Sequence, residues 1–334
     1  MKTIHFQSGS MVSILLLMCC GSLMAQGAPR ISQALASQTG TFEPAQREEI
    51  STFLQYYTQR LLRPSDIEQL RDARQELTRE VNRPGATDSY KAMYATLLVG
   101  QLLPAARSED TNDLIRTNIQ IVTYHLRHPA MVDLALQGLS DETTSVQYWA
   151  AKALAHMAVG DGRFEPVPID AETEQNIMNA IAAHVESPAM DPRVSYSLFQ
   201  AAGGLTSNAA RTTLLELLTD SATRYTAEDA ELAMIAGEDA ALRSLWRWLF
   251  RMQLREQAPP DQIEQLTMVA AKLGHVATRK LHQHRDALSA ADVNAATNLL
   301  ETVQRVFNLA MEAAGQRGQG PQPMDQMLEL PETN

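Results

Sequence analysis

The fold is decided by the stretch Asp141–Leu154, which reads DETTSVQYWAAKAL. Asp141 and the threonines after it suit the start of a helix, because short polar side chains accept hydrogen bonds from the free backbone amides there. The apolar residues Val146, Ala150 and Ala153 follow at spacings of three and four, the pattern of a helix that buries one face. The stretch therefore predicts a helix that buries its apolar face.

The same apolar pattern returns 48 residues later. The aligned core positions are Val146, Tyr148, Ala150, Ala151, Ala153 and Met157 in the first copy and Val194, Tyr196, Leu198, Phe199, Ala201 and Leu205 in the second. Each copy follows another helix, so the expected pairs are Pro129–Leu139 with Thr143–Met157 and Glu172–Glu186 with Pro192–Leu205. A period of about 40–47 residues is typical of stacked helix pairs.

Asp141–Leu154 resembles the second helix of a HEAT repeat, an armadillo-type helical repeat, in its turn aspartate, its Ala-Ala pair and its closing Ala-Leu. The resemblance covers residues 129–206 and implies an α-solenoid of antiparallel helix pairs that bury their apolar faces on one another. The family usually has an arginine after the valine, whereas this chain has Gln147 there and places Arg193 before Val194. An irregular helical bundle, whose pairs look alike because helices pack in similar ways, stays open.

Helices are also expected on both sides of these repeats. The N-terminal region, residues 43–128, is predicted to hold helices at Glu43–Leu62, Ser65–Val81, Asp88–Leu103 and Thr111–His128, after a polar lead-in at 26–42. Ser65 and Glu68 have the spacing of a capping box, while Pro104 and Pro129 are expected to end the last two helices.

Longer helices are expected in the C-terminal region, residues 207–314. A short helix at Ala209–Leu218 precedes three long ones at Ala227–Glu256, Asp261–His284 and Ala290–Ala314, the first with a bend expected at Gly237. Three long helices joined by short turns predict an antiparallel bundle that caps the stack. Residues 315–334 lack any periodicity and are expected to form a disordered tail.

The composition agrees with an all-α globular protein. Of the 334 residues, 45% are hydrophobic and 20% charged, with only 16 glycines and 15 prolines, which excludes a collagen-like or disordered chain. Aromatic residues make up only 5%. Because helix-forming residues recur and β-branched runs are scarce, a large sheet is not expected.

Residues 1–25 have the pattern of a secretory signal peptide. Lys2 precedes the mostly apolar run Met11–Met24, and Ala25 is the small residue expected before the cleavage site. A helix made of this run spans about 21 Å, which is short of the ~30 Å hydrocarbon core of a membrane. The prediction is an exported protein, periplasmic or secreted, that starts near Gln26; an N-terminal membrane anchor is the alternative.

Cys19 and Cys20 are the chain's two cysteines, and both lie inside the predicted signal. Cleavage therefore leaves no thiol, which excludes disulfides, thiolate metal sites and cysteine nucleophiles. Lipoprotein anchoring is the less favoured alternative, because Met18 and Cys19 precede the two cysteines where lipoprotein signals carry a small residue.

The charge of the chain argues against a nucleic-acid partner. The net charge is −11 at pH 7. A surface that binds phosphates needs enough lysine and arginine to overcome that repulsion. We therefore expect no nucleic acid among the partners.

No catalytic, cofactor-binding or metal-binding residue is predicted, and no cofactor is expected. The mature chain has no HExxH, Gly-x-Ser-x-Gly or phosphate-binding loop. His125 and His128 are three residues apart, but no carboxylate accompanies them, and a histidine before Pro129 suits a cap on the carbonyls at a helix end. The loop Gly160–Glu165 is long enough to hold a ligand, although a solvent-exposed loop is the simpler interpretation.

A stripe of arginines is the strongest candidate for a binding surface. The apolar residues Leu242, Leu245, Trp246, Leu249, Phe250 and Met252 share one arc of the predicted helix, whereas Arg243, Arg247, Arg251 and Arg255 recur at every fourth position on the opposite side, with Trp248 beside them. This stripe suits an acidic partner segment or anionic lipid head groups. The competing interpretation is that the arginines pair within the chain, for example Arg243 with Asp239.

Three functional hypotheses follow. The first is a non-catalytic scaffold of the cell envelope or secreted space that binds a protein or peptide on its helical-repeat surface. The second is an envelope-associated structural protein that contacts an anionic membrane through the Arg243–Arg255 helix. The third, least favoured, is an enzyme or metal protein whose site the sequence does not reveal.

Overall fold

The computed structural model describes residues 28–160, 165–185, 191–224, 235–254, 257–284 and 288–315. Over these residues the chain is helical and has no strand, which confirms the all-α prediction. The helices are α1 (Gln33–Ala36), α2 (Pro44–Leu62), α3 (Ile67–Val81), α4 (Asp88–Arg107), α5 (Asp113–Leu126), the 3₁₀ turn η1 (Pro129–Met131), α6 (Val132–Leu139), α7 (Thr144–Val159), α8 (Ala171–Val185), α9 (Pro192–Gly204), α10 (Asn208–Arg224), α11 (Ile235–Gln253), α12 (Pro260–His284) and α13 (Ala290–Ala313).

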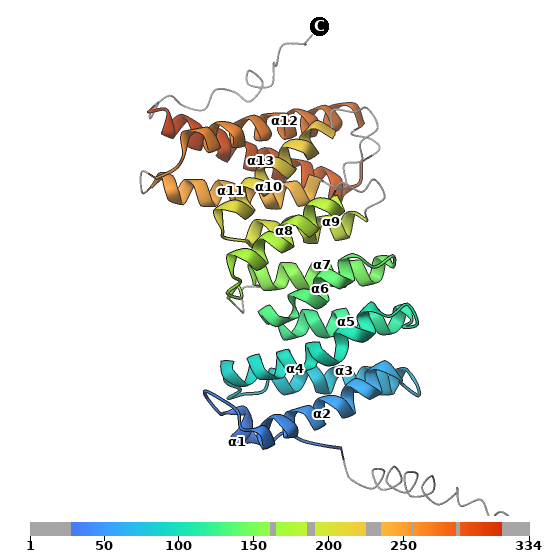
Figure 1. Cartoon of the computed structure of the whole chain (residues 1–334). Coiled ribbons are helices and arrows are strands. Elements are labelled where there is room, and N and C mark those ends of the chain that lie inside the picture. The colour runs from blue at the N-terminus through green and yellow to red at the C-terminus, as the bar shows by residue number, and fades with distance from the viewer. Residues whose placement is uncertain are drawn as a thin grey trace, which may run out of the picture.

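The helices from α2 onward form a stack of two layers (Figure 1). The even-numbered helices pack on one another in one layer, and the odd-numbered helices from α3 to α13 pack on one another in the second. Each even helix also contacts the odd helix that follows it, so the stack consists of six successive pairs. We call the second layer the odd-helix layer.

The two sequence copies at the centre of the stack are α7 and α9, which contact each other along the odd-helix layer. Val146 and Ala150 are buried on α7, and Val194 and Leu198 on α9. Of the aligned tyrosines, Tyr148 packs against the core, whereas the assignment of Tyr196 to the core is wrong. Tyr148 is half-buried and Tyr196 is exposed, because a residue two positions after a buried one lies about 200° further round the helix.

Small residues bring helices of the stack close together. A Cβ atom added at Gly138 of α6 would lie 2.5 Å from the buried side chain of Gln120 on α5 and 2.9 Å from the Cβ atom of Ala150 on α7. The backbone of α6 therefore fits between α5 and α7 because Gly138 has no side chain.

Two predicted helix ends differ in the structure. The residue that caps α3 is Asp66, which accepts a hydrogen bond from the Gln69 amide at 2.7 Å, rather than Ser65. The Gln69 side chain in turn accepts from the Ser65 amide, at 2.8 Å. Pro104 does not end α4, which continues to Arg107. A proline so near the end removes one helical hydrogen bond, and burial of Ala106 favours the additional turn.

The polar lead-in also contributes to the core. Residues 28–42 contain α1, and the apolar side chains of Ile31, Leu35, Ala36 and Phe42 are buried. Arg83, after α3, donates hydrogen bonds to the carbonyl oxygens of Ile31, at 2.9 Å, and Ser32, at 2.6 Å. This segment therefore packs at the N-terminal end of the stack.

The long C-terminal helices extend both layers. In the odd-helix layer α11 packs on α9 and α13 packs on α11, while α12 packs on α10 in the even layer. Gly237 lies in the first turn of α11, and a Cβ atom there would be 2.9 Å from Phe199 of α9. Because residues 225–234 lie outside the described residues, the bend expected at Gly237 stays a prediction. The predicted signal peptide at 1–25 and all but the first residue of the predicted tail at 315–334 lie outside the described residues.

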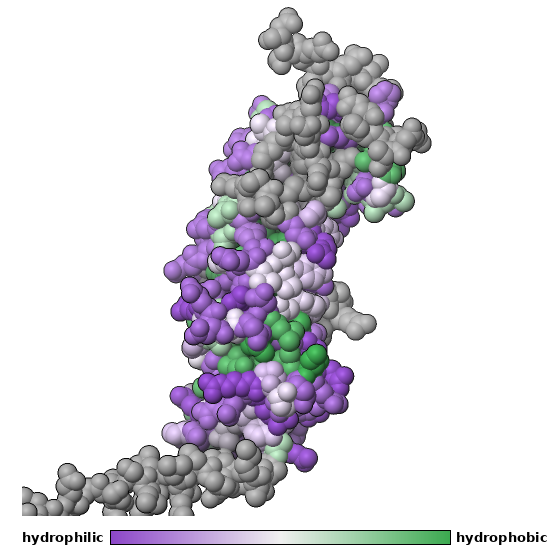
Figure 2. All heavy atoms as spheres, turned by 90° about the vertical axis from the view of Figure 1, so that its right-hand side faces the viewer, coloured by the Kyte–Doolittle hydropathy of each residue, from purple (hydrophilic) through white to green (hydrophobic). Residues whose placement is uncertain are grey.

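The surface at the right of Figure 1 is mostly hydrophilic, with one apolar patch at the height of α4 and α5 (Figure 2). In the first turn of α5, Leu114 is one of the few large apolar side chains that are exposed. No helix within the described ranges has both the length and the apolar character required to span a membrane.

Candidate functional site

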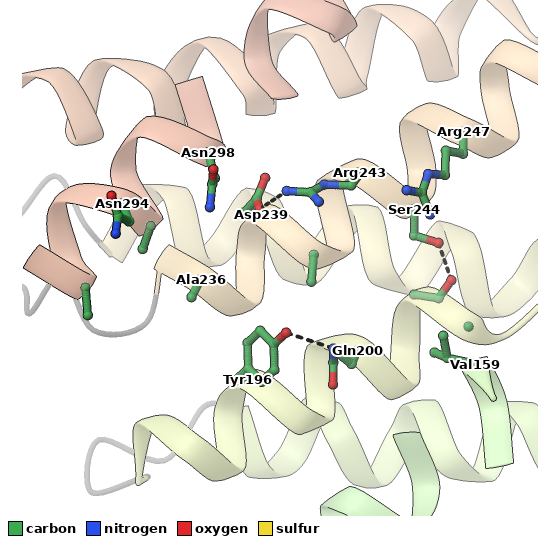
Figure 3. A pocket seen from close by; sticks show the side chains of 15 residues that line it. Val159, Tyr196, Gln200, Ala236, Asp239, Arg243, Ser244, Arg247, Asn294 and Asn298 are labelled. Atoms are coloured by element: carbon green, nitrogen blue, oxygen red, sulfur yellow. Dashed lines mark hydrogen bonds and ion pairs between the residues drawn. The ribbon is translucent and has the colours of Figure 1, made fainter. Parts of the chain in front are cut away.

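A cleft with a volume of about 590 Å³ opens on the odd-helix layer, between α9, α11 and α13 (Figure 3). Its polar lining comes from three helices: Tyr196 and Gln200 from α9, Arg243 and Arg247 from α11, and Asn294 and Asn298 from α13. Small residues provide the space between these side chains, namely Gly203, Gly204, Ala236, Ala240, Ala291 and Ala295. The cleft thus results from alternation of small and polar residues on three packed helices.

A buried carboxylate, that of Asp239, connects two of the helices that form the cleft. Asp239 is only 7% exposed, and its two oxygens have different partners. One accepts a hydrogen bond from the Thr302 hydroxyl on α13 at 2.6 Å, and the other pairs with the Arg243 guanidinium at 2.5 Å. Asp239 therefore connects α11 to α13 and fixes the orientation of Arg243. This ion pair is the one that the four-residue spacing predicts.

Arg247 lies one turn further along α11 and carries the cleft's unneutralised charge. Its side chain is exposed and forms no ion pair with any described residue. On the opposite wall, Tyr196 is 40% exposed, and its hydroxyl accepts a hydrogen bond from Gln200 at 2.9 Å. The side chains of Asn294 and Asn298 make no hydrogen bond within the described part of the chain. The cleft therefore offers one cation and two amide groups with free hydrogen-bonding capacity.

These groups can form hydrogen bonds and ion pairs with a ligand. The cleft is lined by neither histidine nor cysteine, and its one serine, Ser244, donates its hydroxyl to the carbonyl oxygen of Gly203. Amide side chains bond both the N–H and the C=O groups of a peptide, and a guanidinium pairs with carboxylates. The arrangement can therefore hold a peptide that carries an acidic side chain.

The structure divides the predicted arginine stripe between two surfaces. Arg243 and Arg247 line the cleft, whereas Trp248 and Arg251 lie toward α10. Arg255 lies outside the described residues. The stripe is therefore not a single binding surface.

Trp248 is half-buried and packs against the hydrophobic core, so the prediction that it lies away from the apolar side is wrong. The guanidinium carbon of Arg211, from α10, lies 4.5 Å from the centre of one of its rings. Burial, together with the nearby charge of Arg251, lowers the pKa of Arg211 to about 10. The arginine that stacks on Trp248 thus comes from another helix rather than from the stripe.

The cleft residues on α9 and α13 were not predicted from the sequence. Gln200, Asn294 and Asn298 are ordinary polar residues in helices, and their convergence depends on how three helices pack. Tyr196 carried the one available signal, because its position two residues after Val194 places it on the solvent side of α9.

The histidine and loop predictions have separate outcomes. His128 caps an N–H group rather than a carbonyl, since its Nδ1 accepts a hydrogen bond from the Ala130 amide at 3.1 Å. Across the ranges that the structure describes, no three histidine, cysteine, aspartate or glutamate side chains converge as metal ligands do. Most of the loop Gly160–Glu165 falls outside those ranges.

No model of a protein family matches the chain, and no curated protein matches it at a significant level.

Proposed function

We propose that this protein is a non-catalytic scaffold that binds a segment of another protein in the cleft between α9, α11 and α13. The observation that carries the proposal is the chemistry of the lining: an exposed Arg247 with no carboxylate partner among the described residues, beside the free amides of Asn294 and Asn298. The two amides can bond the N–H and C=O groups of a peptide backbone, and the guanidinium can pair with a carboxylate. A peptide segment with an acidic side chain is therefore the ligand that this concave lining fits.

The proposal includes a HEAT-like repeat architecture and export from the cytoplasm. The 48-residue recurrence and the two-layered packing of helix pairs support the first of these. The apolar composition of residues 1–25 supports the second, with the periplasm or the secreted space as the site of action.

Site-specific photo-crosslinking in the native cell envelope tests the proposal. A photoreactive phenylalanine analogue at Tyr196 is expected to capture a defined partner, because this side chain lines the cleft and is exposed. The matched control places the same analogue at Met268, which is 53% exposed on α12 in the even-helix layer.

The exposed arginine of the cleft provides the second control. Arg247→Gln should abolish capture at position 196 while the circular dichroism of the protein stays unchanged, because this side chain forms no ion pair with a described residue. Equal capture at positions 196 and 268, or capture that survives this substitution, would show that the cleft is not the binding site.

The membrane-contact hypothesis has less support. Arg243 is paired with Asp239, and Trp248 is stacked beneath Arg211, which leaves Arg247 and Arg251 as the exposed cations of the stripe within the described residues. Flotation of the mature protein with anionic vesicles should therefore fail. Flotation that is lost on Arg247→Glu with Arg251→Glu would favour the membrane hypothesis instead.

A further inference from the structure

A second polar site surrounds Lys152 on the odd-helix layer. Its ammonium nitrogen lies 5.2 Å from the centre of a Trp149 ring and 5.4 Å from the ring centres of Tyr124 and Tyr148. Tyr124 belongs to α5, and the other three residues belong to α7. All four side chains are half-buried. A cation from one helix is thus surrounded by three aromatic rings from two helices.

The rings around Lys152 are held by contacts of their own. Tyr124 meets Trp149 edge to face, with ring centres 5.6 Å apart, and stacks on His156 at 4.5 Å. The His156 ring nitrogen Nδ1 lies 3.2 Å from the Tyr124 carbonyl oxygen, which joins α7 to α5. Because neighbouring rings pack on these side chains and the His156 contact joins α7 to the backbone of α5, the site is formed before any ligand arrives.

The ammonium group retains its capacity to bind an anion. Lys152 makes neither an ion pair nor a hydrogen bond with any residue that the structure describes. Aromatic rings attract a cation through their electron-rich faces, but they do not supply the carboxylate oxygens that an ammonium pairs with most strongly. The neighbouring Arg193, 5.7 Å from the Tyr148 ring centre, is already neutralised by Asp191. The site therefore has a net positive charge on a chain whose net charge is −11.

We propose that Lys152, with Trp149 and the two tyrosines, binds a carboxylate side chain of an acidic peptide segment whose other part occupies the cleft. This inference rests on the proposed function, because the same odd-helix layer carries both sites. Packed helices lie about 8–10 Å apart, so α7 and α11 are separated by roughly 18 Å. An extended chain covers this distance in about five residues. The partner segment is thus expected to carry two acidic residues about five positions apart.

The measurement is NMR titration, which follows the indole N–H resonances of the protein's tryptophans as peptide is added. The Trp149 resonance is assigned from its absence in a Trp149→Phe variant. The probe is the blocked peptide acetyl-GSGEGSGSEGSG-amide, and its control has glutamine in place of both glutamates. We expect the glutamate peptide to shift the Trp149 signal, and the control peptide to leave it in place. Lys152→Gln should lower the affinity roughly tenfold, because it removes one charge-assisted hydrogen bond.

Variants separate this inference from the proposed function. Lys91→Gln removes a lysine that is paired with Asp88 on α4 and should not alter binding. Lys152→Met keeps the apolar stem of the side chain and serves if the glutamine variant does not fold. If Arg247→Gln lowers the affinity for the glutamate peptide but the Trp149 resonance still shifts at saturating peptide, both proposals hold. If Arg247→Gln has no effect while Lys152→Gln does, the cleft proposal fails and the Lys152 site stands.

Other results overturn the Lys152 inference and leave the cleft untouched. These are an equal shift with the glutamine peptide, unchanged affinity in both Lys152 variants, and a Trp149 shift produced by anionic vesicles or inorganic phosphate but not by the glutamate peptide. The last of these would assign the site to a lipid head group or a free anion instead of a peptide.

Discussion

Glu174 shows how one buried carboxylate joins two helix pairs. It lies on α8, is 3% exposed, and accepts hydrogen bonds from the amides of Thr206, at 2.9 Å, and Ser207, at 2.6 Å, just before α10. Burial raises the pKa of Glu174, but the hydrogen bonds from Thr206 and Ser207 outweigh burial and hold its pKa below the ordinary value. The charged form is therefore the one that stabilises the fold.

Glu174→Gln should lower the free energy of unfolding by about 1–3 kcal/mol at neutral pH, because the new amide group places donors against donors. The measurement is urea unfolding of the two proteins over a range of pH. A lowered pKa in the folded state means that the stabilisation is fully present above the pKa of the unfolded chain, about 4.3 for glutamate, and is lost as the pH falls through the folded pKa.

The difference between wild type and variant should accordingly shrink below about pH 4. Glu172→Gln is the matched control, since Glu172 is exposed in the first turn of the same helix. A difference that grows as the pH falls would contradict the assigned charge state of Glu174.

Single residues also mark the limit of what the sequence predicts about the candidate site. The pairing of Arg243 with Asp239 could be predicted because four residues along a helix bring two side chains together. The stacking of Arg211 on Trp248 could not, because 37 positions and a change of helix separate the two residues. Lys152 likewise has partners on α7 that its spacing reveals and one on α5, Tyr124, that only the packing brings near.

At the scale of helices, substitution of glycines can distinguish tightly packed helix contacts from open surface. A side chain at Gly138 would meet Gln120, whose own amide donates a hydrogen bond to the Leu134 carbonyl at 2.8 Å and cannot easily move. Gly138→Ala is therefore expected to cost about 1–3 kcal/mol of stability, the range for overpacking in a core. Chemical denaturation measures this change.

Gly100→Ala supplies the matched control on α4, where an added Cβ atom has nothing within 4 Å. This substitution should raise stability by about 0.5–1 kcal/mol, because alanine loses less backbone freedom in a helix than glycine does. If both substitutions changed the free energy of unfolding in the same direction, packing around Gly138 would not explain the effect of Gly138→Ala.

Helix ends proved harder to predict than helix cores. Apolar spacing located the interiors of α2, α3 and α5 because it reports which face is buried. The end of α4 depends on the balance between the bond lost at Pro104 and the burial of Ala106, and this balance is set by neighbouring helices. Polar residues before α3 offer two competing caps, and the structure uses Asp66.

For the whole molecule, the order of the helix pairs predicts that a destabilising substitution affects only its own pair and the neighbouring helices. Each helix pair packs on the pair before and the pair after it. In such an array, stability is close to a sum of terms from each unit and its neighbours. Amide hydrogen exchange of Gly138→Ala should therefore speed up in α5, α6 and α7 while α12 and α13 exchange as in the wild type. A uniform acceleration over all helices would show that the stack unfolds as one unit.

The central part of this architecture could be predicted and the flanks only in part. Two aligned copies around α7 and α9 indicate stacked pairs because their apolar positions repeat. No comparable recurrence marks α11 and α13, so their continuation of the odd-helix layer, and with it the cleft, depends on contacts that a single sequence does not display.

The pairwise order also bears on how such a chain can change over generations. An insertion or loss of one complete internal pair would leave the remaining pairs packed in the same two layers, whereas a change of half a pair would exchange the two layers. Each added pair would lengthen the odd-helix layer by about 10 Å, the distance between packed helices. Growth by whole pairs would therefore adjust the length of the proposed peptide-binding surface without redesigning the sites already present.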